Sequence, residues 1–257
     1  MMKKKILFLS IIGLSWMNIA YADSNEAIVL MYHGISNKIN STNTNLSDFK
    51  QQINYLEKNH FHIISTQELV NDIKNQKDFP NKSIVITFDD GWKDQDEAMQ
   101  VLAQKNIPAT FCLVTWFQSF NSPTDLQKVD FKKYQNAPFT YINHSYTHNI
   151  HQFLVHPNQD TNKSEKVLDK LFGHYQPYYT YPYGLYNEKL LNVLKEHGYI
   201  AAYGVAGEPV RLNHVNIFNI PRYEITTHTT MKEFENIVNK LDNHQQNASK
   251  IIAIAKK

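Results

Sequence analysis

Two neighbouring aspartates give the chain its first sign of chemistry. Asp89 and Asp90 directly follow the apolar run 84–88, which reads as a buried strand, and Gly91 comes next. Consecutive side chains on a strand point to opposite faces, so both carboxylates can serve one cavity only if the chain turns there, which Gly91 permits. Adjacent carboxylates at such a turn favour a bound cation. The alternative is a helix N-cap with an acidic first turn.

Two histidines four residues apart supply a matching ligand type. His144 and His148 follow the apolar run 139–142. Imidazoles with this spacing at a strand end can face one point and bind a first-row metal through neutral nitrogens. With Asp90 they predict a three-ligand catalytic site for one divalent ion, zinc by default, with a position left open for water. Because the chain contains 12 histidines, a surface or core role is the alternative for each imidazole.

Short apolar runs alternate with stretches of helical period along the chain. This alternation predicts an α/β fold, a parallel sheet with helices outside, either open or closed into a barrel. Catalytic groups gather at the carboxyl ends of the strands in both architectures. No glycine-rich phosphate loop follows any run, which disfavours a nucleotide-binding site. The expected strands are 27–32, 61–64, 84–88, 110–114, 139–142, 178–181, 199–205 and 216–220; the expected helices are 47–58, capped by Ser47, 66–74, 94–105, 164–172, 187–196, capped by Asn187, and 230–241.

The N-terminus has the pattern of an export signal. Three lysines precede a short apolar run, and alanines stand at positions 20 and 22, so residues 1–22 are expected to be removed and 23–257 to form one domain. No later stretch is long and apolar enough to span a membrane. Loss of the signal takes away three lysines and moves the formal charge from +2 to −1, which argues against a nucleic-acid partner. We expect a periplasmic or secreted protein. Its single cysteine, Cys112, lies in an apolar run and is expected to be buried and inert.

Four motifs together resemble the polysaccharide deacetylases with a NodB-type domain. They are Thr87-Phe88-Asp89-Asp90-Gly91, Pro108-Ala109-Thr110-Phe111, His144-Ser145-x-x-His148 and Tyr181-Pro182-Tyr183-Gly184. The likeness covers about residues 27 to 240 and is specific in order and spacing. It implies a distorted (β/α)7 barrel of the polysaccharide deacetylase (NodB) type, in which one of the eight expected strands is not part of the barrel.

The resemblance also implies a role for each motif. Asp90, His144 and His148 would hold the metal, and Asp89 would be the general base that takes a proton from water. The backbone N–H of Tyr183 would stabilise the oxyanion that forms on the acetyl carbonyl, a task that needs a donor fixed in advance.

Two roles depend on where this chain differs from many family members. His33 follows the run 27–32 and would be the general acid, as in the subgroup that acts on biofilm poly-N-acetylglucosamine; His228, late in the chain, competes for this role. Where many members have an arginine that orients the catalytic aspartate, this chain has Thr180. We expect Arg222, after the run 216–220, to supply that charge, the alternative being a surface salt bridge.

The implied activity is removal of N-acetyl groups from N-acetylglucosamine residues of a polysaccharide. Poly-N-acetylglucosamine is favoured, and peptidoglycan, chitin-like glycans and O-acetyl esters stay open. Trp92, Trp116 and Tyr183 are the expected contacts with the sugar.

The strongest rival is a weakly active or inactive carbohydrate-binding relative, although such a module would not need a base, three ligands and an acid. A glycosidase is disfavoured because its carboxylates must flank the bond from separate positions. Residues 244–257 have no expected role.

Overall fold

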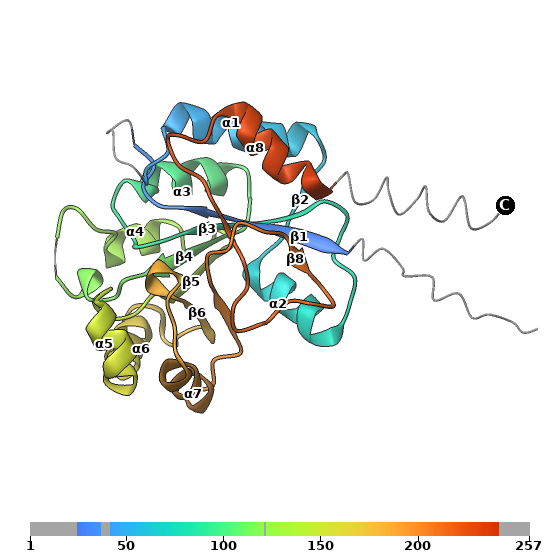
Figure 1. Ribbon diagram of the computed structural model, residues 1–257. Coiled ribbons are helices and arrows are strands. Elements are labelled where there is room, and N and C mark those ends of the chain that lie inside the picture. Colours follow the sequence, from blue (N-terminus) through green and yellow to red (C-terminus); the bar gives the residue numbers. More distant parts are fainter. Residues whose placement is uncertain (1–24, 37–41, 121, 242–257) are drawn as a thin grey trace, which may run out of the picture.

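The computed structural model describes residues 25–36, 42–120 and 122–241 (Figure 1). The expected export signal, 1–22, and the C-terminal stretch 244–257 lie outside these residues. Within the described part of the chain, no helix has the length and apolarity needed to cross a membrane.

A curled, mostly parallel sheet occupies the centre of the molecule (Figure 1). Its main path runs β7-β6-β5-β4-β3-β1-β8, and β9 pairs in parallel with β1. Ile220, just before β9, bridges to Tyr203 of β7, so the segment around residues 220–224 links the two ends of the curl. The expected α/β class with a distorted barrel is confirmed. The strands are β1 (Glu26–Tyr32), β2 (His62–Ile63), β3 (Ser83–Phe88), β4 (Ala109–Leu113), β5 (Phe139–Asn143), β6 (Tyr178–Thr180), β7 (Ala201–Tyr203), β8 (Val210–Arg211) and β9 (Tyr223–Glu224).

Two of the eight expected strands differ from the prediction in an informative way. The run 61–64 contributes only the two-residue β2, which pairs with the first residues of β3, so it is the extra strand outside the barrel. The run 216–220 was expected to be a strand, and this is wrong except for the bridge at Ile220. The Asn216 side chain accepts the N–H of Phe218 at 3.0 Å, and the Asn216 carbonyl accepts that of Asn219 at 2.8 Å. These bonds hold a turn where apolar residues alone suggested extension.

Helices surround the sheet, and α1 lies beside α8 along one side of the molecule (Figure 1). The expected cap at Asn187 is confirmed, because its side chain accepts the N–H of Leu190 at 2.9 Å. Ser47 is not a cap, since α1 already begins at Leu46 with Asn45 before it. The helices are α1 (Leu46–Lys58), α2 (Thr66–Asn75), α3 (Gln95–Gln104), α4 (Lys128–Lys133), α5 (Ile150–Val155), α6 (Pro157–Phe172), α7 (Glu188–Glu196) and α8 (Met231–Val238), with short 3-10 turns η1 (Phe117–Ser119) and η2 (Pro182–Gly184).

Strand alternation decides which side chains face the inside of the curl. Along β1, Ile28 and Leu30 belong to an apolar cluster that includes residues of α1, α3 and α8. Ala27 and Val29 belong to a second cluster, with Val85 of β3 and residues of α2. Side chains alternate between the two faces of a strand, and Ala27, Val29 and Val85 face the inside of the curl. Residues that follow the strands at the same spacing of two therefore also face the inside. His33 after β1 and Asp89 after β3 are at such positions, so both side chains face the inside of the curl.

Candidate active site

Asp89 continues the inner face of β3 and is almost completely buried, with 3% of its surface exposed. Both of its carboxylate oxygens accept hydrogen bonds from the Arg222 guanidinium, each at 2.7 Å. Burial alone would raise the pKa of Asp89, but the charges of Arg222 and His144 and the Arg222 hydrogen bonds outweigh it and hold the pKa well below its usual range. The carboxylate is therefore ionised at neutral pH.

Arg222 reaches Asp89 from the segment that links β7 to β1. It is fully buried, so it is not part of a surface salt bridge. Its Nε donates to the Gly204 carbonyl at 3.0 Å and one terminal nitrogen to the Thr87 hydroxyl at 3.1 Å. The guanidinium also lies 5.7 Å from the centre of the Tyr203 ring. These contacts fix its planar fork in the orientation that a carboxylate needs.

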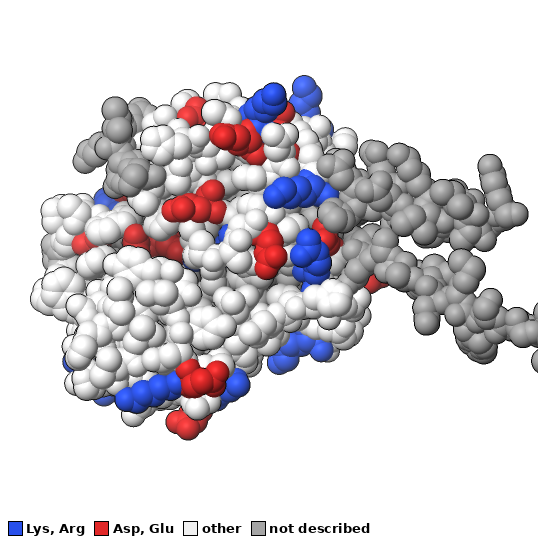
Figure 2. Space-filling view, viewed as in Figure 1, with Lys and Arg blue, Asp and Glu red and all other residues white. Residues whose placement is uncertain are grey.

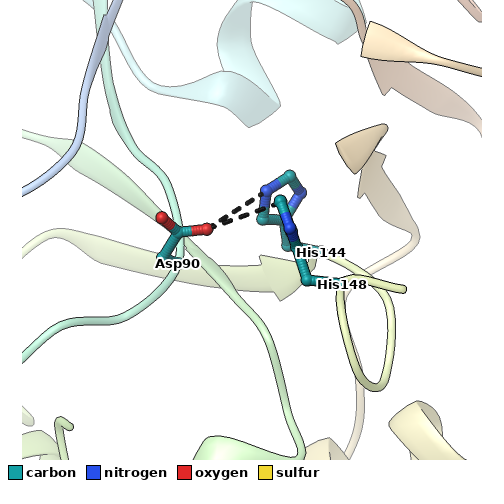
Figure 3. A group of neighbouring side chains, drawn as sticks. All are labelled: Asp90, His144 and His148. Atoms are coloured by element: carbon teal, nitrogen blue, oxygen red, sulfur yellow. Dashed lines mark ion pairs between the residues drawn. The ribbon is translucent and has the colours of Figure 1, made fainter. Parts of the chain in front are cut away.

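Asp90 points the other way because the backbone turns at this residue. Its φ of +76°, followed by +83° at Gly91, places it in the left-handed region. One carboxylate oxygen of Asp90 lies 3.7 Å from Nε2 of His144 and 3.6 Å from Nε2 of His148 (Figure 3). The other accepts the indole N–H of Trp92 at 2.9 Å. Neighbours in sequence thus have different hydrogen-bond partners, although Nε2 of His144 also lies 3.9 Å from one oxygen of Asp89.

Both imidazoles direct a ring nitrogen toward Asp90 (Figure 3). Nδ1 of His144 lies 2.9 Å from the Thr180 carbonyl, a contact in which Nδ1 donates, so Nε2 is the nitrogen directed at Asp90. Burial, followed by the neighbouring His144, lowers the pKa of His148 to about 4. A neutral ring is the form that binds a metal.

Backbone strain is concentrated in this loop. Ser145 has a φ of +68° and His148 one of +59°, and the Ser145 hydroxyl accepts the N–H of His148 at 2.9 Å. Non-glycine residues in this region cost free energy and persist where the surrounding structure enforces them, as at binding and catalytic sites.

The three side chains suit a divalent metal. One ligand atom from each of Asp90, His144 and His148 lies within 4.8 Å of the other two. One carboxylate and two imidazoles are a set that zinc and other first-row ions accept, with a position left open for water. The Thr180 carbonyl orients His144, and the Trp92 indole orients Asp90, each through an atom of the ligand that does not face the metal site.

His33 and Tyr183 border the same centre. His33 directly follows Tyr32, whose carbonyl accepts the N–H of Asp89 at 2.9 Å, so His33 and Asp89 lie at the same edge of the sheet. The buried Nδ1 of His33 has no hydrogen-bond partner among the described residues. Tyr183 has a φ of +58° in the turn η2, and its ring lies 4.4 Å from that of His148. By contrast, His228 lines a separate cavity against α8, which removes the support for it as the acid.

The two expected tryptophan contacts occupy different places. Trp92 bonds Asp90 and packs against Phe117 with ring centres 5.1 Å apart. Trp116 is 41% exposed and packs against Phe120 with ring centres 4.6 Å apart. Trp92 therefore touches the candidate metal centre directly, whereas Trp116 lines a cavity beside it.

Sequence reasoning missed one residue that joins the acid and the base. The Gln95 side-chain amide donates to the His33 carbonyl at 3.2 Å and to the Asp89 carbonyl at 2.5 Å, and Gln95 is fully buried. It ties the ends of β1 and β3 together. A glutamine at the start of a helix carries no signal of this kind, so the sequence did not indicate it.

The family model for polysaccharide deacetylase matches residues 76–202, which include both aspartates and both histidines of the site. A poly-beta-1,6-N-acetyl-D-glucosamine N-deacetylase of Staphylococcus aureus (strain MSSA476) is 27% identical over 252 residues, covering 85% of this chain and 83% of that protein. The Staphylococcus epidermidis protein of the same name is 26% identical over 250 residues, covering 83% and 84%.

Solved structures of similar shape include a protein named as a deacetylase. A Streptococcus pyogenes deacetylase, PplD, in complex with acetate gives a TM-score of 0.75 at 19% identity, covering 83% of this chain and 98% of that one. IcaB from Ammonifex degensii gives 0.73 at 18% identity, covering 84% and 97%. These likenesses establish the fold. The family-model match, the agreement with relatives over most of the chain and the converging motifs show that this chain belongs to the polysaccharide deacetylase family.

Proposed function

We propose that this deacetylase removes N-acetyl groups from poly-β-1,6-N-acetylglucosamine with one divalent metal ion, zinc by default. The substrate is inferred from the relatives named above, which act on that polymer and align over most of both chains. The observation that carries the mechanism is the division between two adjacent carboxylates, one paired with Arg222 and the other facing two imidazoles.

Asp90, His144 and His148 would hold the ion. When bound, such an ion supplies a Lewis acid and lowers the pKa of water. Residues of the protein carry out the proton transfers and stabilise the oxyanion. The ionised Asp89 accepts a proton from the attacking water, whose oxygen forms a bond to the acetyl carbon. The backbone N–H of Tyr183 donates to the carbonyl oxygen as negative charge develops on it.

His33 would complete the reaction as the acid. As the bond between the acetyl carbon and nitrogen breaks, a protonated His33 donates its proton to the departing amine, giving acetate and glucosamine. Arg222 acts through Asp89 as a positioning residue, because it touches the base from inside the barrel and not the open side of the site. Gln95 keeps His33 and Asp89 at a fixed separation.

The surface and the N-terminus fit an exported enzyme of a neutral glycan. On the face drawn in Figure 2, basic and acidic side chains lie in small separate groups between wide uncharged areas. We propose that residues 1–22 direct export to the periplasm or the exterior and that 23–257 form the deacetylase domain.

Acetate release decides this proposal. Wild-type protein should release acetate from β-1,6-linked N-acetylglucosamine oligomers faster than from peptidoglycan, a chelator should abolish release, and zinc should restore it. Release that survives both the chelator and Asp89→Asn would refute the mechanism. Binding of the oligomer without any acetate would favour the carbohydrate-binding relative.

A further inference from the structure

A cavity lies beside the loop that carries the two histidines. Its volume is about 410 Å³, which is within the range of small-molecule sites. Thr147 and Asn149, which flank His148, form one wall, so the cavity and the candidate metal centre share this loop. The lining consists of Trp116, Phe117, Tyr146, Thr147, Asn149, Gln152, Gln159, Asp160 and Lys163. We call it the loop cavity.

The loop cavity contains a deeply buried carboxylate with one oxygen unused. Asp160 is 3% exposed, and its Oδ1 accepts the N–H of Tyr146 at 3.0 Å. Its Oδ2 is buried and accepts no hydrogen bond from the described residues. Burial raises the pKa of Asp160 to about 6, although backbone N–H groups and Lys163 act to lower it. A buried acceptor without a donor costs free energy, which a ligand hydroxyl placed there would recover.

Aromatic and amide side chains complete the lining. The exposed Trp116 ring offers an apolar surface, and the Phe120 ring packs against it with ring centres 4.6 Å apart. The Lys163 ammonium lies 5.5 Å from the centre of the Tyr146 ring and brings a cationic donor to the cavity that also holds Asp160. Because one cation accompanies one carboxylate, the cavity suits a neutral ligand with hydroxyl and amide groups. Asn149, Gln152 and Gln159 can both donate to and accept from such groups.

We propose that the loop cavity binds a neighbouring N-acetylhexosamine unit of the polysaccharide while another unit occupies the metal centre. A pyranose ring stacks on Trp116, one hydroxyl donates to Oδ2 of Asp160, and Lys163 donates to a hydroxyl or acetamido oxygen. This inference rests on the proposed function, because it assumes a polymeric substrate. It explains why an aromatic side chain that does not touch the candidate ligands is presented at this position.

The backbone connects the two sites. The N–H of Trp116 donates to the Tyr146 carbonyl at 2.8 Å, and the N–H of Thr115 to the Ser145 carbonyl at 3.2 Å. The segment that follows β4 therefore supports the histidine loop and also contributes Trp116 to the lining of the cavity. A substrate that reaches both sites gains affinity that a single acetylated unit does not have.

The test compares substrates that differ in length. Steady-state acetate release is measured with a β-1,6-linked N-acetylglucosamine pentamer and with a small aryl acetate ester, which reaches only the metal centre. In Trp116→Ala and in Lys163→Ala, the ratio of kcat/KM for the pentamer to that for the ester should fall about tenfold, mainly through the KM of the pentamer. Lys166→Ala, an exposed lysine on the same helix that does not line the cavity, should keep the wild-type ratio.

The outcomes separate the two proposals. If wild-type protein releases no acetate from either substrate, the proposed function fails. If wild-type protein is active but Trp116→Ala and Lys163→Ala leave the ratio within twofold of wild type, the loop cavity does not bind the polymer. Because Lys163 is exposed, its replacement should fold even if that of Trp116 does not.

Discussion

Asp89 and Asp90 are adjacent in sequence but differ in almost every physical respect. Asp89 lies inside the barrel, where a buried arginine holds both of its oxygens. Asp90 turns out of the strand at a positive φ and divides its oxygens between two imidazoles and an indole. One backbone turn at the end of β3 therefore creates two carboxylates suited to different tasks.

The difference teaches that the partner, and not burial alone, decides what a carboxylate can do. Burial by itself raises a carboxyl pKa, as it does at Asp160, whereas the bidentate Arg222 reverses the direction at Asp89. Asp89 is thereby kept ionised and oriented, and Asp90 is left available to a metal. The following changes should break or sharpen this contrast.

Removing the arginine should have the largest effect. Arg222→Met leaves Asp89 buried without its cation, and breaking a buried ion pair in this way costs about 3–5 kcal/mol of unfolding free energy. Acetate release should also fall, because the base loses its orientation. Denaturant unfolding measures the first effect. Lys105→Met, which breaks an exposed pair with Glu57 at 2.6 Å, serves as the control and should cost about 1 kcal/mol or less.

Replacing the base should lower the rate strongly, and it should also lower the stability, because the buried Arg222 guanidinium then loses its counterion. Asp89→Asn keeps the size of the side chain but removes its ability to accept a proton from water, so kcat should fall by about 10²- to 10⁴-fold. Circular dichroism should show the wild-type secondary structure. A variant with more than a tenth of wild-type kcat would show that Asp89 is not the base.

A buried carboxylate without an arginine should behave in the opposite way to Asp89. The pKa of Asp160 is raised to about 6 in the folded protein, so the folded state binds more protons than the unfolded state from about pH 4 to pH 6. Unfolding free energy should therefore fall as pH rises through this window, by roughly 2–3 kcal/mol relative to Asp160→Asn. Chemical denaturation at several pH values tests this. Equal pH dependence in both proteins would contradict it.

Removing the hydrogen bond from Trp92 to Asp90 should have the smallest effect. Trp92→Phe keeps an aromatic ring but removes the N–H that donates to Asp90 at 2.9 Å. Such a supporting bond is worth about 10- to 100-fold in metal affinity. Competition with a chromogenic chelator measures the change, and Trp116→Phe, which leaves Asp90 untouched, should match the wild type.

Much of the site follows from strand periodicity. The apolar runs before His33, Asp89 and His144 identified β1, β3 and β5, and parallel strands bring their carboxyl ends to one edge. The positions of these residues in the strand pattern place them on the inner side. Sequence reasoning could therefore find the edge and the residues that meet there.

Other features depend on contacts that periodicity does not reveal. The bond between Arg222 and Asp89 joins residues 133 apart in sequence, and the sequence indicated it only through the resemblance to the family. Helices α4 and α5 have six residues each, too few for a helical period to be recognised. Helix α6 was expected from residue 164, but it begins at Pro157, a residue suited to the first turn. This error left Asp160 in an expected loop and hid its place beneath the histidine loop.

Metal binding by the two aspartate variants tests the central claim most directly. Zinc is titrated calorimetrically into Asp89→Asn and Asp90→Asn, each compared with wild type. The account predicts that Asp89→Asn binds one zinc ion with an affinity within about tenfold of wild type, whereas Asp90→Asn loses at least about a hundredfold. Equal loss in both variants, or tight binding by Asp90→Asn, would contradict the division of labour between these neighbours.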